Sequence, residues 1–67
     1  MSVAKHIELT ADSTKSFEDA IQIGIKKAGE TVDNITAAWV KGQQALVENG
    51  QIATYRVQLK VTFVLKS

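Results

Sequence analysis

The chain has no cysteine and no proline, and its 67 residues include one histidine, one tryptophan and one tyrosine. Without cysteine there is no disulfide, and a single histidine leaves too few strong ligands for a structural zinc site. Repeats and low-complexity runs are also missing, so nothing indicates a linker between domains. Residues 1–67 are therefore predicted to form one domain.

An excess of charge of one sign is missing as well. Eight Lys and Arg residues stand against seven Asp and Glu residues, and the basic residues are scattered along the chain. A nucleic-acid groove needs a concentrated basic stripe, so we expect no nucleic-acid partner. Lys5, His6 and Glu8 interrupt any signal-peptide core, and no apolar run reaches membrane-spanning length. We expect a cytoplasmic protein that is not bound to a membrane.

The small size of the chain predicts self-association. A domain of this length buries only about 60% of the surface of its unfolded chain, which leaves a marginal core. Small domains compensate with disulfides, metals or oligomerisation. Because the first two are not indicated by this composition, a homo-oligomer is the expected form.

The clearest secondary-structure signal is the alternation of apolar and polar residues from 54 to 65, which predicts a half-buried strand. Asn49-Gly50 precedes it, and this pair favours the type I′ turn of a two-residue β-hairpin. Residues 35–48 should therefore fold back onto the last strand as its antiparallel neighbour.

A two-residue loop also predicts which residues face each other across the hairpin. The expected pairs are Trp39 with Lys60, Lys41 with Gln58, and Gln43 with Arg56. All six should share one face of the sheet. The other face carries Val40 and Leu59 and should be covered by a helix.

The first part of the chain predicts a strand and then that helix. Residues 3–10 alternate, residues 11–15 read as a polar connection, and Ser16 is a good helix N-cap that Asp19 can complement. An apolar stripe containing Gly24 follows at helical spacing, and Gly29 should end the helix. The predicted class is α+β with the order β-α-β-β, and the last strand is central if the first strand lies beside it.

Catalytic constellations are not indicated. His6 has no serine or cysteine signature around it, the acidic residues lack EF-hand spacing, and the glycines form no phosphate-binding loop. We therefore do not expect an enzyme, and no residue can be named as a metal ligand.

Trp39 stands out because the predicted register places this large aromatic side chain on the face away from the helix. Such a residue marks either a contact between subunits or a ligand surface. In the second interpretation Trp39 forms a wall for a flat aromatic ligand, and Gln43, Arg56 and Gln58 contact its polar edge. The sequence leaves both interpretations open.

The chain resembles the dodecin family from Val3 to Leu65 without a gap. The resemblance is carried by Val3-x-Lys5-x-Ile7-Glu8-Leu9-Thr10, Ser16-Phe17-Glu18-Asp19-Ala20, Thr31-Val32-Asp33-Asn34-Ile35 and Tyr55-x-Val57-x-Leu59-x-Val61-x-Phe63-x-Leu65. It implies a three-stranded antiparallel sheet wrapped around one helix, and twelve copies assembled into a hollow shell. Typical members bind flavins in pairs between subunits, store or sequester them, and are not enzymes.

The resemblance is weakest at the residues that hold the flavin in typical members. The family's stacking tryptophan falls at Ala37, and this chain carries Trp39 two residues later, about 6.6 Å along the same face. Arg56 replaces the usual glutamine after the tyrosine of the last strand. Some dodecin relatives that lack the stacking tryptophan are associated with calcium or with no known ligand, and this chain resembles them at positions 37 and 39 and in Thr54-Tyr55-Arg56.

The expected function is thus a dodecin-like homododecamer that stores FMN or riboflavin. The expected cofactor-binding residues are Ala37, Trp39, Gln43, Arg56 and Gln58. The alternative is a dodecin-fold assembly that has lost flavin and serves as an ion-binding scaffold, for example for calcium, or as a structural one.

Overall fold

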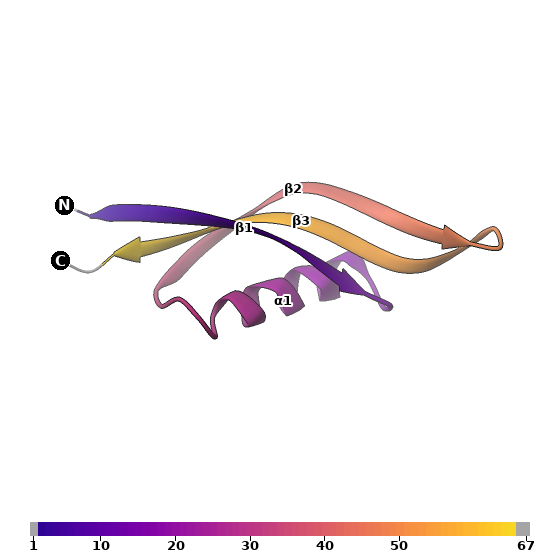
Figure 1. Ribbon diagram of the computed structural model, residues 1–67, viewed down its shortest axis with the longest axis horizontal. Coiled ribbons are helices and arrows are strands. Elements are labelled where there is room, and N and C mark those ends of the chain that lie inside the picture. The colour runs from indigo at the N-terminus through magenta and orange to yellow at the C-terminus, as the bar shows by residue number, and fades with distance from the viewer. Residues whose placement is uncertain (1, 66–67) are drawn as a thin grey trace.

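The computed structural model describes residues 2–65, which form one sheet and one helix in the order predicted (Figure 1). The elements are β1 (Val3–Ser13), α1 (Phe17–Ala28), β2 (Ile35–Glu48) and β3 (Gln51–Leu65). The sheet has the strand order β1-β3-β2, and both pairs are antiparallel. The strand with the most regular alternation, β3, is the central one, as expected.

The strand β1 is three residues longer than the alternation of residues 3–10 predicts. Ala11 pairs with Val57 and Ser13 pairs with Tyr55, and both Ala11 and Ser13 are buried. The predicted polar connection over residues 11–15 is therefore wrong in its first three residues. Ala11 and Ser13 point to the same buried side of β1 as Ile7 and Leu9, but their small side chains do not form a recognisable apolar face in the sequence.

The helix α1 begins where its capping residue predicts. Ser16 is the N-cap, and its Oγ accepts a hydrogen bond of 2.9 Å from the backbone N–H of Asp19. The Asp19 carboxylate does not complete a reciprocal capping box; it accepts a 2.6 Å hydrogen bond from the Ser13 hydroxyl. This bond joins the start of the helix to the end of β1. Gly29 is the C-cap, as predicted.

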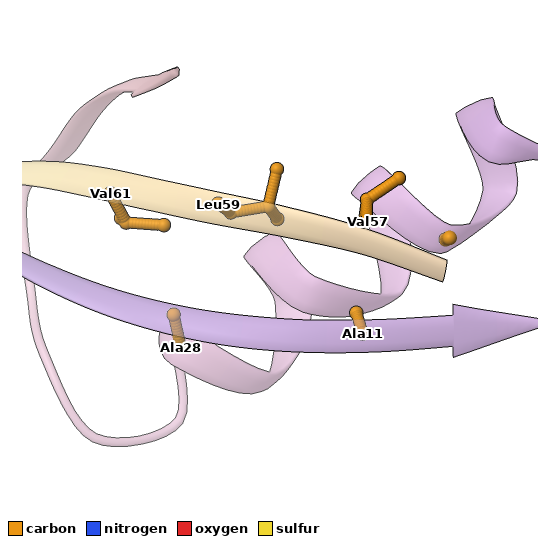
Figure 2. Close-up of a cluster of buried hydrophobic side chains, with 6 residues drawn as sticks. Ala11, Ala28, Val57, Leu59 and Val61 are labelled. Carbon is orange, nitrogen blue, oxygen red and sulfur yellow. The ribbon is translucent and has the colours of Figure 1, made fainter. Parts of the chain in front are cut away.

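Gly24 lets the helix lie very close to the sheet. A Cβ atom at this position would be 2.7 Å from Cδ1 of Leu59 and 3.2 Å from Cβ of Ala11. Figure 2 shows Val57, Leu59 and Val61 of β3 together with Ala11 and Ala28, which form most of this core. The helix contacts mainly β1 and β3, so the core lies under these two strands.

The turn at Asn49-Gly50 is confirmed, but the predicted register is only partly correct. Both residues have positive φ, 52° and 75°, and Glu48 pairs with Gln51 across the two-residue loop. Trp39 pairs with Lys60, as predicted. Between the turn and Trp39 the ladder is shifted by one residue, because β-bulges interrupt it between Leu46 and Val47 and again between Val40 and Gly42.

These two bulges place one extra residue in each strand of the hairpin, and a third register shift, between Ile35 and Ala37, leaves Thr36 unpaired at the start of β2. Ala53 is unpaired in β3, and Lys41 is unpaired in β2, so the second bulge restores the register that the first one shifts. In the shifted segment Gly42 pairs with Gln58, Gln43 with Val57 and Gln44 with Arg56. The predicted pairs of Lys41 with Gln58 and of Gln43 with Arg56 are therefore wrong.

The molecule is long and thin, with extents of 51 × 19 × 14 Å. In Figure 1 the hairpin turn projects beyond the N-terminal end of α1, while the start of β1 and the end of β3 lie together at the opposite end of the sheet. Within residues 2–65, no helix is long and apolar enough to cross a membrane.

Candidate functional site

The candidate site is the sheet face opposite α1, called the open face below. Residues that pair directly across antiparallel strands point to the same face, so the pairing defines its rows. Three rows form its centre: Glu8, Lys60 and Trp39; Thr10, Gln58 and Gly42; Asp12, Arg56 and Gln44.

Trp39 dominates this face, as its parity in the sequence predicts. Its side chain is 63% exposed. The Lys41 ammonium lies over the indole, 4.5 Å from the ring centroid, in a cation–π contact. Because an exposed contact of this kind is worth only about 0.5–1 kcal/mol, Lys41 covers one side of the ring weakly. A ligand ring can therefore reach the indole without losing a strong interaction.

Ala37 lies on the same side of Trp39 as the start of β2 and pairs with Thr62. Because its side chain is only a methyl group, no bulky side chain projects from the open face at this position beside the indole. In the same row, Nδ1 of His6 lies 2.9 Å from the Thr62 hydroxyl, which gives the lone histidine a local hydrogen-bond partner.

A shallow hollow of about 360 Å³ lies on the other side of Trp39, across β1, β3 and β2. Glu8, Thr10, Lys41 and Gln58 contribute to its lining. The Gln58 amide leans over Gly42, since its Oε1 is 3.0 Å from the place where a Cβ of residue 42 would lie. A side chain at position 42 would displace this amide, so Gly42 helps to shape the hollow.

Arg56 is on the open face, but it is held by a partner that the sequence did not reveal. Its Nε and Nη2 donate hydrogen bonds of 2.8 and 3.0 Å to the two carboxylate oxygens of Asp12. These hydrogen bonds, helped by the positive charge of Arg56, lower the pKa of Asp12 below its ordinary value of 3.8. The polar residues 11–15 predict a connection there, so the sequence gives no sign of this ion pair.

The structure thus brings together four of the five predicted ligand residues. Ala37, Trp39, Arg56 and Gln58 share the open face. Gln43 does not, because it pairs with the buried Val57 and so belongs to the face that contacts the helix. The first bulge exchanges the faces of Gln43 and Gln44, and a bulge leaves no signal in the alternation of residues.

Potential metal ligands are not gathered into one cluster in the described part of the chain. Among residues 2–65 there is no group of three or more His, Cys, Asp or Glu side chains that could hold a metal ion. The carboxylates of Glu8 and Asp12 do lie on the open face, and Asp12 is already bonded to Arg56.

The fold and its open face define a small β-α-β-β protein with a surface suited to a flat ligand or to another subunit. The sequence profile of the family described as Dodecin matches residues 3–66. The chain therefore belongs to the dodecin family, as the motifs of the sequence predict.

Similar proteins differ in what their names say they bind. The calcium dodecin of Mycobacterium tuberculosis (strain ATCC 25618 / H37Rv) is 35% identical over 66 residues, which cover 98% of this chain and 93% of that protein. A crystal structure of the M. tuberculosis calcium dodecin, described as calcium chelating, aligns with a TM-score of 0.83 at 34% identity, over 97% of this chain and 93% of that one.

Other dodecin structures follow the backbone more closely. A mutant of the Thermus thermophilus dodecin has a TM-score of 0.93 at 28% identity, covering 100% of this chain and 98% of that one. The dodecin from Streptomyces davaonensis has a TM-score of 0.92 at 27% identity, covering 98% and 97%. The chain is thus more similar to the calcium dodecin in sequence and to these two proteins in shape.

Proposed function

We propose that this dodecin is a homododecamer that holds a flavin, FMN or riboflavin, on the open face of its sheet and stores it in the cytoplasm without catalysing a reaction. The observation that carries the proposal is Trp39. A 63% exposed indole on a sheet face is unfavourable in water unless another surface covers it. A flavin ring system is flat, aromatic and large enough to do so.

The surroundings of Trp39 favour stacking from the side of Ala37. On the other side the ring already has Lys41 at 4.5 Å, whereas position 37 offers only a methyl group. A flavin lying over Ala37 would occupy the place of the side chain that stacks in typical family members. The shifted tryptophan would then form the end wall of the site.

Gln58 and Arg56 lie on the other side of Trp39 from Ala37, so in this proposal they contact a part of the flavin molecule that extends past the indole, such as its side chain. The Gln58 amide makes no side-chain hydrogen bond within the described residues, so both its donor and its acceptor are available. Arg56 keeps one guanidinium nitrogen, Nη1, outside its two bonds to Asp12. Gln43 is removed from the site that the sequence predicted, because it lies on the helix face.

The shape of the chain supports assembly into a shell. The radius of gyration is 13.7 Å, whereas a compact domain of this length has a value of about 11 Å. An elongated chain of this size exposes a large surface for its mass. Further copies of the chain are the simplest cover for that surface.

Flavin titration tests the ligand. Purified protein is mixed with FMN or riboflavin, and flavin fluorescence and size-exclusion elution are recorded for the wild type, Trp39→Ala and Trp39→Phe. We expect quenching by the wild type, at least about tenfold weaker binding by Trp39→Ala, and binding retained by Trp39→Phe, because stacking needs an aromatic ring.

The elution position separates the two roles of Trp39. An unchanged oligomer that no longer quenches flavin supports the ligand wall. A Trp39→Ala protein that dissociates makes Trp39 a subunit contact instead. A wild-type oligomer that neither quenches nor carries flavin at excess flavin concentration rejects the flavin proposal.

A second candidate function is calcium binding, favoured by the 35% identity to a calcium dodecin. The described part of one chain offers no cluster of three acidic or histidine ligands, so such a site would have to combine carboxylates from several subunits. We expect calcium to raise the melting temperature and chelator to lower it if this candidate is correct, because an ion bound only to the folded assembly stabilises it. Magnesium at equal concentration is the control, and equal melting temperatures in calcium and chelator reject the candidate.

A further inference from the structure

The indole ring of Trp39 has a defined direction on the open face. The Lys41 ammonium lies over one face of the ring, 4.5 Å from its centroid. Because Lys41 follows Trp39 along β2, this face of the ring is turned towards the later residues of the strand. The opposite face is therefore turned towards Ala37, the earlier residue on the same side of the sheet. A flat ligand stacked on that opposite face stands on edge above the row of residues that contains Ala37.

This row, called the outer row below, crosses all three strands. It consists of Ala37 on β2, Thr62 on β3 and His6 on β1. Because neighbouring strands lie about 4.8 Å apart, the row is about 10 Å long, which suits the long axis of a three-ring flavin nucleus. In Figure 1 the helix covers only the other side of the sheet, so no element of the chain stands over this row.

The outer row is apolar at one end and polar at the other. Ala37 presents only an exposed methyl group. At the other end, Nδ1 of His6 lies 2.9 Å from the Thr62 hydroxyl, which is a hydrogen-bond distance. A hydroxyl can make more than one hydrogen bond, and Nε2 of His6 makes none within residues 2–65. The row therefore offers both an acceptor and a donor beside a methyl group.

A flavin nucleus has the same asymmetry. Its dimethylbenzene end is apolar, whereas its pyrimidine end carries two carbonyl oxygens with the N3–H group between them. Polar groups that leave water without a new partner cost free energy. The pyrimidine end therefore belongs over Thr62 and His6, and the dimethylbenzene end belongs over Ala37. The reverse orientation would press an apolar ring onto two polar side chains.

We propose that Thr62 and His6 bind the pyrimidine end of a flavin stacked on Trp39. The Thr62 hydroxyl donates to Nδ1 of His6 and accepts a hydrogen bond from the flavin N3–H, while Nε2–H of His6 donates to the adjacent carbonyl oxygen. The inference rests on the proposed flavin function and adds to it which end of the ring system lies over β3 and β1. Neither residue is among the ligand residues that the sequence predicts.

A flavin that lacks the N3–H group tests this contact. Riboflavin and N3-methylriboflavin are titrated against the wild type and Thr62→Val, with quenching of flavin fluorescence as the measurement. Val keeps the branched shape of Thr and removes the hydroxyl. We expect the wild type to bind riboflavin about tenfold more tightly than the methylated compound, and Thr62→Val to bind both with similar affinity. A preference that persists in Thr62→Val would come from exclusion of the methyl group by shape and would contradict the hydrogen bond.

A second variant tests the histidine, and a third is the matched control. His6→Phe keeps a flat ring and removes both nitrogens, so we expect weaker binding of riboflavin and a smaller preference over the methylated compound. Thr54 is also half-buried on β3, and it pairs with Leu46 near the other end of the open face. Thr54→Val should therefore change neither affinity. Size-exclusion elution of each variant shows whether it keeps the wild-type assembly.

The outcomes separate this inference from the flavin proposal. A wild type that quenches both flavins equally, and loses both with Trp39→Ala, overturns the roles of Thr62 and His6 and leaves the flavin proposal standing. This comparison needs no substitution in the outer row, so it decides the question even if Thr62→Val fails to fold. A wild type that binds neither compound rejects both proposals.

Discussion

At the scale of single residues, the ion pair between Asp12 and Arg56 ties β1 to β3 across the open face. Both oxygens of the carboxylate are engaged, at 2.8 and 3.0 Å, which fixes the guanidinium in one orientation. The side chain of Asp12 is 43% exposed and that of Arg56 is 37% exposed, so water weakens the pair. Its main effect is therefore to aim Arg56 rather than to stabilise the fold strongly.

The pKa of Asp12 predicts how this pair responds to acid. Because the hydrogen bonds from Arg56 lower the folded pKa below 3.8, the stabilisation is fully present above pH 3.8 and is lost as the pH falls through the lowered value. We expect Asp12→Asn to melt at a slightly lower temperature than the wild type at pH 7, with the difference shrinking towards pH 2. Melting curves from pH 7 to pH 2 measure it.

The matched control is Asp33→Asn, since Asp33 is exposed and has no ion partner within residues 2–65. Its difference from the wild type should not follow the pattern of Asp12. A melting difference for Asp12→Asn that stays constant over the whole pH range would show that the ion pair does not act on stability.

Residue-level features were predictable only where they follow from the parity of a single strand. The exposure of Trp39 on the open face came from its alternation with Val40, and the structure agrees. The face of Gln43 and the partner of Arg56 depend on pairing between strands, which the bulges and the true end of β1 decide. No pattern within one strand contains that information.

At the scale of elements, the packing of α1 on β1 and β3 depends on the missing side chain of Gly24. Leu59 is 1% exposed, so it has little room to move away from a new methyl group, and Cβ of Ala11 belongs to the sheet itself. The added group would have to push the helix outward. Close approach therefore outweighs the lower helix propensity of glycine.

We expect Gly24→Ala to destabilise the fold by about 1–3 kcal/mol, the usual cost of overpacking, although Ala is intrinsically about 1 kcal/mol better in a helix. Gly29→Ala is the control. Its φ of −65° suits any residue, and its new Cβ would meet only ordinary contacts of 3.4 Å or more, so it should stabilise by about 0.4–1 kcal/mol. Denaturant titration of both variants measures the two values, and a Gly24→Ala protein as stable as Gly29→Ala would contradict the close packing.

The elements themselves were largely predictable because they carry strong local signals. The alternation in β3, the cap at Ser16 and the turn at Asn49-Gly50 each act over a few residues, and all three are confirmed. The end of β1 was missed because Ala11 and Ser13 are too small to mark a buried face, although they are buried under the helix.

At the scale of the whole molecule, the core is small in relation to the length of the chain. Its buried members are three alanines together with Val57, Leu59 and Val61. Short side chains allow the helix to approach the sheet, but they remove little apolar surface from water. The exposed Trp39, Val47 and Ile52 lie outside this core, so large apolar side chains are left for partners to cover.

Two of the three register shifts in the hairpin, at Ala53 and at Lys41, have a consequence for how the length of this protein can change. Ala53 is a surplus residue in β3 and Lys41 is a surplus residue in β2. Because the two shifts cancel, the pairing register is the same at the turn and at Trp39. A family member lacking only one of them would either lose the two-residue turn or give Trp39 a partner other than Lys60. Insertions or deletions between positions 40 and 59 therefore preserve the pairing of Trp39 and the two-residue turn only when they come as compensating pairs, one in each strand of the hairpin.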